Sequence, residues 1–375
     1  MKCFAIAAPG LEPLLEDELK ELGIKGKAVP GGVEWNGSES SVAIANLWSR
    51  IASRVVVRIG EFSARTFFEL ERHAKKVEWQ KYLGPDTAVQ FRVTAKKSKL
   101  YHTGAITQRL QEAIARQLKR DVVIAGSAED EDADVGAQIF IVRVERDQFT
   151  ISADTSGALL HRRGYRQAVA KAPLRETLAA AMLRGAEWNA KTPVVDPMCG
   201  SGTIAIEAAM IARKIPPGLE RKFAFLEWPG ADLARWNSLV AHARGQILGR
   251  SPAAIAASDR DAGAIEAARS NAERAGVAND IQLAVQAISA ATPIGTGPGL
   301  LITNPPYGER VGDTKAIRNL YAQLGNVARA SFSGWDLAML SANKALDGQT
   351  QIDFAERFKT SNGGIPVRLV IGRVE

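Results

Sequence analysis

The chain has 375 residues, a net formal charge of +7 and 46% hydrophobic residues. This length allows two or three domains, and the basic balance favours a polyanionic partner such as a nucleic acid. The two cysteines are too far apart for a disulfide framework, and the four histidines are scattered, so no metal site is predicted. The sequence shows no signal peptide and no apolar stretch of bilayer length, which predicts a cytoplasmic protein without membrane contact.

The first 64 residues are expected to form a small α/β domain. Residues 3–7 and 54–59 have the pattern of strands, and residues 31–35 form a turn that leads into a third strand. Residues 11–22 and 40–48 are predicted helices. In residues 11–22 the apolar side chains recur at helical spacing.

A basic loop in the second unit is a candidate RNA-binding surface. It follows a strand predicted over residues 88–95 and precedes a helix with Ile106, Leu110 and Ile114 on one face. Positive charge interleaved with an aromatic ring is typical of RNA-binding surfaces, and a solvated turn is the alternative. The candidate RNA-binding residues are Lys96, Lys97, Lys99, Tyr101 and His102.

A cationic cluster lies between the two halves of the chain. Arg162, Arg163 and Arg166 are predicted to contact RNA phosphates as well as to join the domains. The alternative is a solvated linker face that makes modest salt bridges. An acidic run at residues 129–134, further upstream, is expected to be a surface loop.

A glycine-rich turn is the first candidate for cofactor binding. Residues 194–195 end a predicted buried strand and residues 204–209 begin a helix, which is the layout of a nucleotide-binding crossover. Glycines permit close backbone approach to a ligand, but no lysine follows the second glycine and the spacing misses the dinucleotide fingerprint. The candidate residues are Asp196, Pro197, Cys199, Gly200, Gly202 and Thr203, with Cys199 expected to be a packed residue rather than a nucleophile.

Two further strands end in polar residues. Residues 253–259 form an apolar strand that ends in Asp259, followed by Arg260, and an acid at this place typically binds a pair of ribose hydroxyls. Asp261 is either a second acid of the site or the N-cap of the next helix. The third strand, over residues 281–285, is followed by Gln286.

The loop after residues 301–303 contains the candidate catalytic residues Asn304, Pro305, Pro306 and Tyr307. Prolines fix the backbone and present carbonyl acceptors without donors, and an aromatic ring stands beside them. These are the groups needed to hold a planar amine while another group attacks it.

Together these segments resemble the class I S-adenosylmethionine-dependent methyltransferases, and Asn-Pro-Pro-Tyr resembles their amino-group-methylating version. The resemblance implies an α/β fold with a Rossmann-like doubly wound sheet. It places S-adenosylmethionine over Gly200 and Gly202, with Asp196 near the methionine part, Asp259 on the ribose and Asn304 at the same pocket.

The same resemblance implies roles for the catalytic loop. The side-chain oxygen of Asn304 and the carbonyl of Pro305 accept hydrogen bonds from the exocyclic amine of a nucleobase, and Tyr307 stacks on the flipped base. Gln286 departs from the pattern, because such enzymes usually place an aspartate there. Its amide oxygen is expected to accept from the adenine amino group less strongly than a carboxylate would.

The resemblance extends along most of the chain. The order of strand, basic loop and long helix resembles the THUMP domain, and residues 154–178, 216–219, 223–228, 308–313 and 361–364 resemble bacterial THUMP-containing guanine-N2 methyltransferases of large-subunit ribosomal RNA. This implies a ferredoxin-like domain at 1–64, a THUMP RNA-binding domain at 65–155, a linker at 156–172 and a methyltransferase domain at 173–375. The aromatic residues Phe223, Phe225, Trp228 and Trp236 are expected to be core rather than a base-stacking platform.

The predicted activity is therefore methylation of a guanine N2 in 23S ribosomal RNA, with S-adenosylmethionine as the methyl donor. A transfer-RNA guanine-N2 methyltransferase is the main alternative. An adenine-specific DNA methyltransferase would share the tetrapeptide without needing the N-terminal half. A catalytically silent RNA-binding or assembly factor is the alternative from a different class.

Overall fold

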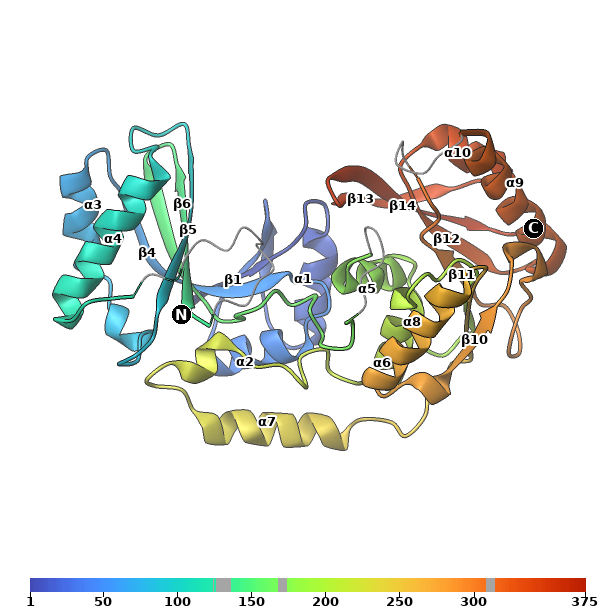
Figure 1. Cartoon of the computed structure of the whole chain (residues 1–375), viewed down its shortest axis with the longest axis horizontal. Helices are drawn as coiled ribbons and strands as arrows, with labels where there is room; N and C mark the ends of the chain where they lie inside the picture. The colour runs from blue at the N-terminus through green and yellow to red at the C-terminus, as the bar shows by residue number, and fades with distance from the viewer. Residues whose placement is uncertain (124, 126–135, 168–173, 308–313) are drawn as a thin grey trace.

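Figure 1 shows the computed structural model of the chain, which is elongated, with the helices of residues 67–118 toward one end, the first helix of the chain near the middle and the C-terminal sheet at the other end. The structure describes residues 1–123, 125, 136–167, 174–307 and 314–375. The acidic run at 129–134, the linker residues 168–172 and the segment 308–313 lie outside the described residues.

The first unit contains every element that the sequence predicted for it. The strands and helices, in chain order, are β1 (Lys2–Ile6), α1 (Glu12–Glu21), β2 (Lys27–Val29), β3 (Gly32–Asn36), α2 (Glu39–Trp48) and β4 (Arg54–Ser63). Strand β1 pairs antiparallel with both β3 and β4. Helix α1 buries Leu15 and Leu19 against this sheet, which explains its apolar spacing.

The second unit adds a helical layer and three strands. Its elements are α3 (Phe67–Ala74), η1 (Trp79–Lys81), β5 (Val89–Lys96), α4 (Thr103–Leu118), β6 (Gln138–Glu145) and β7 (Gln148–Asp154). A capping box between Thr66 and Glu69 begins α3. The predicted apolar face of α4 is confirmed, because Ile106, Leu110 and Ile114 are fully buried.

Strand β4 joins the two N-terminal units into one sheet. It runs past the predicted end at residue 59, and it pairs with β1 on one side and with β7 on the other. In the described residues this sheet has seven strands in the order β2-β3-β1-β4-β7-β6-β5. The two units therefore share a continuous hydrogen-bonded backbone rather than a flexible connection.

The C-terminal half is a doubly wound α/β sheet, as predicted. Its strands are β8 (Val194–Asp196), β9 (Ile255–Asp259), β10 (Ile281–Val285), β11 (Leu300–Thr303), β12 (Asp336–Ser341), β13 (Ala355–Asn362) and β14 (Ile365–Arg373). The order is β10-β9-β8-β11-β12-β14-β13, and the strands from β10 to β12 are parallel. The direction of winding reverses between β8 and β11, and ligands of such sheets bind outside the carboxyl ends of the strands at this switch point.

Helices cover both faces of this sheet. They are α5 (Glu176–Gly185), α6 (Thr203–Ala212), α8 (Ala262–Arg274), α9 (Thr314–Ser331) and α10 (Lys344–Gln349), with short turns η3 (Ala278–Asp280) and η4 (Ile288–Ala290). A further short turn, η2 (Ala224–Glu227), lies in the insertion after α6. Helix α6 is buried on nearly all sides, which is typical of a helix enclosed between packed layers. No helix in the described ranges is long and apolar enough to cross a membrane.

Helix α7 (Leu233–Gly245) lies outside both layers, along one long side of the molecule (Figure 1). Arg235 near its start donates to the hydroxyl of Ser40 at 3.1 Å, and Arg244 near its end pairs with Glu220 at 2.8 Å. The insertion between α6 and β9, which contains α7, therefore contacts the N-terminal unit through Arg235.

Candidate active site

The sheet brings the three predicted segments together. Asp196, Asp259 and Thr303 are the last residues of β8, β9 and β11, which are neighbours in the sheet. Since these strands are parallel, the loops that follow them meet at one edge. This edge is the switch point of the winding.

The glycine turn after β8 is held against the end of β9. The backbone N–H of Gly200 donates to Oδ2 of Asp259 at 3.0 Å, and the N–H of Cys199 donates to the carbonyl of Ser258 at 3.0 Å. Gly200 and Gly202 have φ values of 52° and 82°, which side chains rarely adopt.

The two glycines differ in what surrounds them. A Cβ atom on Gly202 would lie 2.9 Å from Cβ of Ala268 on α8, so this glycine is needed for close helix packing. A Cβ atom on Gly200 would meet nothing within 4 Å. Open space therefore lies next to the Gly200 backbone, where a ligand can approach.

Asp196 is a buried acid, with 1% of its surface exposed. Its Oδ1 accepts from the backbone N–H of Met198 at 3.2 Å, and it forms no ion pair within the described residues. Burial, aided by the charge of Asp259, raises the pKa of Asp196 to about 7, although the hydrogen bond from the Met198 N–H acts in the opposite direction. A positively charged ligand group would stabilise the ionised form of this carboxyl.

Asp259 has both carboxylate oxygens engaged by backbone donors. Oδ1 accepts from the N–H of Asp261 at 3.0 Å and Oδ2 from Gly200. Each oxygen retains a lone pair that a ligand hydroxyl can use. Asp261 is the N-cap of α8, because its carboxylate accepts from the N–H of Gly263 at 2.8 Å. This confirms the capping alternative for Asp261.

The other predicted cofactor residues vary in exposure. Pro197 and Cys199 are buried, and burial raises the pKa of the Cys199 thiol, in agreement with a packed residue. Arg260 is exposed beside Asp259. Gln286 is half-buried, and its backbone N–H donates to the carbonyl of Asp259 at 2.8 Å, which links the ends of β9 and β10.

Asn304 presents an unsatisfied acceptor at the start of the loop that follows β11. Its Oδ1 atom is buried and has no hydrogen-bond partner in the described part of the chain. Such a buried acceptor costs about 1–3 kcal/mol, so its presence calls for a functional reason. Pro305 is buried and Pro306 half-buried beside it.

Tyr307 closes the described part of this loop, with 9% of its surface exposed. Its hydroxyl accepts a hydrogen bond of 2.6 Å from Nδ2 of Asn362, at the end of β13. Burial raises the pKa of Tyr307, and the bond from Asn362 partly offsets this. No local pattern in the sequence gave Asn362 a role, although it lies in the segment 361–364 that carried the family resemblance.

The structure corrects the prediction made for the arginine cluster. The Arg163 side chain is only 1% exposed, donates to the carbonyl of Arg50 at 2.7 Å and pairs with the buried Glu207 at 3.5 Å. Arg166 pairs with Glu176 at 3.1 Å and is largely buried. The prediction that Arg163 contacts RNA is wrong, because its guanidinium is enclosed between the two halves.

Arg166 is directed toward the cofactor turn instead. Its guanidinium donates to the hydroxyl of Thr203 at 2.8 Å, at the first residue of α6. Thr203 itself is buried. Of the three predicted arginines, Arg162 is the one that is exposed.

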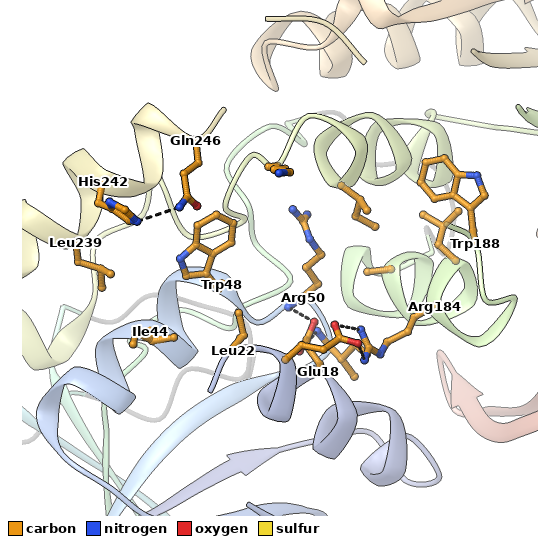
Figure 2. A pocket seen from close by; sticks show the side chains of 16 residues that line it. Glu18, Leu22, Ile44, Trp48, Arg50, Arg184, Trp188, Leu239, His242 and Gln246 are labelled. Carbon is orange, nitrogen blue, oxygen red and sulfur yellow. Dashed lines mark hydrogen bonds and ion pairs between the residues drawn. The ribbon is translucent and has the colours of Figure 1, made fainter. Parts of the chain in front are cut away.

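A cavity of about 550 Å³ lies beside this buried cluster (Figure 2). Trp48 and Trp188 stand on either side of the Arg50 side chain, and Glu18 accepts from the Arg50 backbone N–H at 2.9 Å. Arg50 also donates to the carbonyl of Ile215 at 2.6 Å. The cavity is lined by residues of α1, α2, α5, α6 and α7, and none of its described lining residues belongs to the predicted site.

The basic loop of the second unit is exposed, as an RNA-binding surface requires. The side chain of Tyr101 is 63% exposed, and its ring centroid lies 4.1 Å from that of His102. Lys97 and Lys99 are exposed on the same loop, and Lys96 is exposed at the end of β5. Their RNA contacts stay a prediction.

The aromatic residues of the insertion pack as expected. Phe223 is buried in the main core, and Phe225, Trp228 and Trp236 are partly buried against it. The indole N–H of Trp228 donates to Oε1 of Gln138 at 2.7 Å, which attaches the insertion to β6.

Comparisons with known proteins agree with this geometry. Residues 163–371 match the family model described as "RMKL-like, methyltransferase domain", and residues 2–56 match the "RlmL ferredoxin-like domain". The crystal structure of SMU.472, solved in complex with SAH, has a TM-score of 0.89 and 32% identity, and the match covers 100% of this chain and 98% of that one.

Two curated relatives match almost the whole chain. A Synechocystis sp. protein, named provisionally as an RNA methyltransferase, is 34% identical over 369 residues, which are 98% of this chain and 95% of that protein. The ribosomal RNA large subunit methyltransferase K/L of Syntrophotalea carbinolica is 37% identical over 382 residues, covering 99% of this chain but 53% of the relative. The chain thus spans about half the length of the K/L protein and belongs to the RMKL-like methyltransferase family.

Proposed function

We propose that this protein transfers a methyl group from S-adenosylmethionine to the exocyclic N2 of a guanine in 23S ribosomal RNA. The observation that carries the proposal is the buried, unpartnered Oδ1 of Asn304 at the switch point of the sheet, among the residues that the structure describes. An acceptor held in this way is ready to bind an amine N–H, and it needs no reorganisation when positive charge develops on the nitrogen.

The cofactor is proposed to lie along the carboxyl ends of β8, β9 and β10. Asp196 would face its cationic methionine part and Asp259 its ribose, while the open side of Gly200 allows close backbone approach. S-adenosylmethionine supplies an electrophilic methyl group on a sulfonium. The similar structure SMU.472 holds SAH, the product form of this cofactor.

The amine is proposed to bind at the loop after β11. Asn304 and the Pro305 carbonyl would accept from the two N–H groups, which aligns the nitrogen lone pair with the methyl group. Tyr307 would stack on the base that has left its helix. These roles need acceptors and a fixed ring rather than a strong base.

Ribosomal RNA is proposed as the substrate because the K/L relative is named for the large ribosomal subunit. The exposed loop with Lys96, Lys97, Lys99, Tyr101 and His102 would bind the RNA outside the catalytic site. We also propose the domain division 1–64, 65–155, 156–172 and 173–375, supported at each end by the matches over residues 2–56 and 163–371.

Transfer of labelled methyl groups tests the proposal. The protein is incubated with labelled S-adenosylmethionine and, in separate reactions, with unmodified 23S ribosomal RNA, bulk transfer RNA and duplex DNA. We expect label in the ribosomal RNA, and Asn304→Ala is expected to abolish most of it. Label in transfer RNA or DNA instead would show that ribosomal RNA is not the substrate. Full activity of Asn304→Ala would refute the proposed role of the Asn304 amide.

A further inference from the structure

The β13–β14 hairpin has a turn of defined geometry. Asn362 pairs with Ile365, and Gly363 and Gly364 connect them with φ values of 57° and 83°. Two central residues with positive φ are typical of the type I′ turn, which matches the twist of the strands. A Cβ atom on either glycine would meet nothing within 4 Å, so the glycines are required by the backbone conformation and not by crowding.

This turn extends past the edge of the sheet that carries the active site. Ser341, the last residue of β12, pairs with Arg368, whereas β14 begins at Ile365. At a rise of about 3.3 Å per residue, the hairpin reaches roughly 10 Å beyond the carboxyl end of β12. Since β12 is the neighbour of β11, the turn stands over the loop of residues 304–307.

A side-chain hydrogen bond joins the hairpin to this loop. Nδ2 of Asn362 donates to the hydroxyl of Tyr307 at 2.6 Å. The Tyr307 ring is attached to the loop at its Cβ end and held by Asn362 at its hydroxyl end. Both ends of the ring are therefore fixed, and a swing of the side chain away from the hairpin would break this bond.

We propose that Asn362 is a positioning residue that sets the orientation of the Tyr307 ring for the target base. The inference rests on the proposed function, in which Tyr307 stacks on the flipped base. A stacked base must present its amine to Asn304 and to the methyl group at the same time, and small errors of orientation reduce the rate of transfer. Asn362 acts through Tyr307 and does not itself touch the reacting atoms.

Steady-state kinetics of Asn362 variants test this proposal. Asn362→Ala is expected to lower kcat about 3- to 10-fold, the effect of one neutral hydrogen bond, with KM for 23S ribosomal RNA within about twofold. Ser361→Ala, the exposed neighbour on the same strand, is the matched control and should leave both constants unchanged. Asn362→Asp should recover part of the loss, because a carboxylate accepts the hydrogen of the Tyr307 hydroxyl.

A double-mutant cycle separates positioning from a general structural effect. Tyr307→Phe removes the acceptor, so Asn362→Ala should have little further effect in the Tyr307→Phe background. Independent, multiplying losses, or an Asn362→Ala protein with wild-type kcat, would overturn the inference. If wild type methylates a different nucleotide, the proposed substrate fails, but the same cycle on that substrate still decides the role of Asn362.

Discussion

The guanidinium of Arg166 donates to the hydroxyl of Thr203 at 2.8 Å, which ties the segment between the two halves to the helix that follows the glycine turn. Glu176 at the start of α5 pairs with the same arginine at 3.1 Å. The connection between the N-terminal and catalytic halves thus reaches the candidate cofactor site directly.

Replacement of Arg166 is expected to affect cofactor binding more than RNA binding. Arg166→Ala should weaken S-adenosylmethionine binding about 3- to 10-fold, because α6 loses the partner at its first residue. Isothermal titration with S-adenosylmethionine measures this. Unchanged cofactor affinity together with a smaller salt dependence of RNA binding would instead show that Arg166 contacts an RNA phosphate.

The basic loop is expected to carry electrostatic RNA contacts. Replacing Lys96, Lys97 and Lys99 with Ala should reduce the slope of log K against log salt by about 0.7–0.9 for each phosphate that the loop no longer neutralises. Filter binding of 23S ribosomal RNA fragments at several salt concentrations measures the slope. The solvated-turn alternative predicts the wild-type slope.

Arg163 is expected to stabilise the fold. Its buried guanidinium pairs with Glu207 and donates to the backbone carbonyl of Arg50, so Arg163→Ala should cost about 1–3 kcal/mol, because these contacts are lost while Arg50 stays 3.6 Å from Glu207. Arg162→Ala, at the exposed neighbouring position, should change stability by less than about 0.5 kcal/mol. Guanidinium chloride unfolding compares the two, and equal stabilities would contradict the structural role of Arg163.

The two glycines of the turn should separate packing from ligand approach. Gly202→Ala should lower stability by about 2–3 kcal/mol, because a left-handed φ combines with a 2.9 Å contact to Ala268. Gly200→Ala should cost about 1 kcal/mol of stability but should still impair binding, because its Cβ enters the open space beside the turn. Thermal unfolding and cofactor titration check both, and a Gly200→Ala protein with wild-type affinity would place the ligand elsewhere.

The raised pKa of Asp196 predicts a pH dependence of stability. A folded-state pKa of about 7, above the value of 3.8 in an unfolded chain, means that the folded state binds a proton more tightly. Stability from this group is therefore present at low pH and is lost as pH rises through 7, by about 4 kcal/mol in total. In the absence of ligand, the Asp196→Asn protein should have the same free energy of unfolding as wild type near pH 4 and a higher one at pH 8.

Unfolding of both proteins across this pH range measures the effect. The other buried acids are present in both proteins, so their contributions cancel in the difference between the two free energies of unfolding. A variant that is less stable than wild type at pH 8 would show that the ionised carboxylate is stabilised in the ligand-free protein.

The meeting of the three segments of the candidate site at one edge of the sheet was predictable, because their residues lie at or just after strand ends. Asp196 and Asp259 end largely apolar strands and Asn304 follows another, and parallel pairing then brings them to one edge. Local patterns of this kind need no knowledge of distant contacts. The elements of the first unit were predictable for the same reason.

Long-range relationships were not predictable from local patterns. The burial of Arg163 depends on Glu207, which lies on a helix of the other half, and the role of Asn362 depends on a hairpin that passes over the loop of Tyr307. The shared strand β4 likewise requires its pairing with β7, a strand distant in the sequence. A charged cluster in sequence therefore shows neither its exposure nor its partner.

Nucleoside mass spectrometry of 23S ribosomal RNA tests the central claim most directly. Unmodified RNA is incubated with the protein and labelled S-adenosylmethionine, digested to nucleosides and analysed for the labelled product. The account predicts label in N2-methylguanosine, present with wild type and strongly reduced with Asn304→Ala. Label in any other nucleoside, or none with a protein that binds the cofactor, would contradict it.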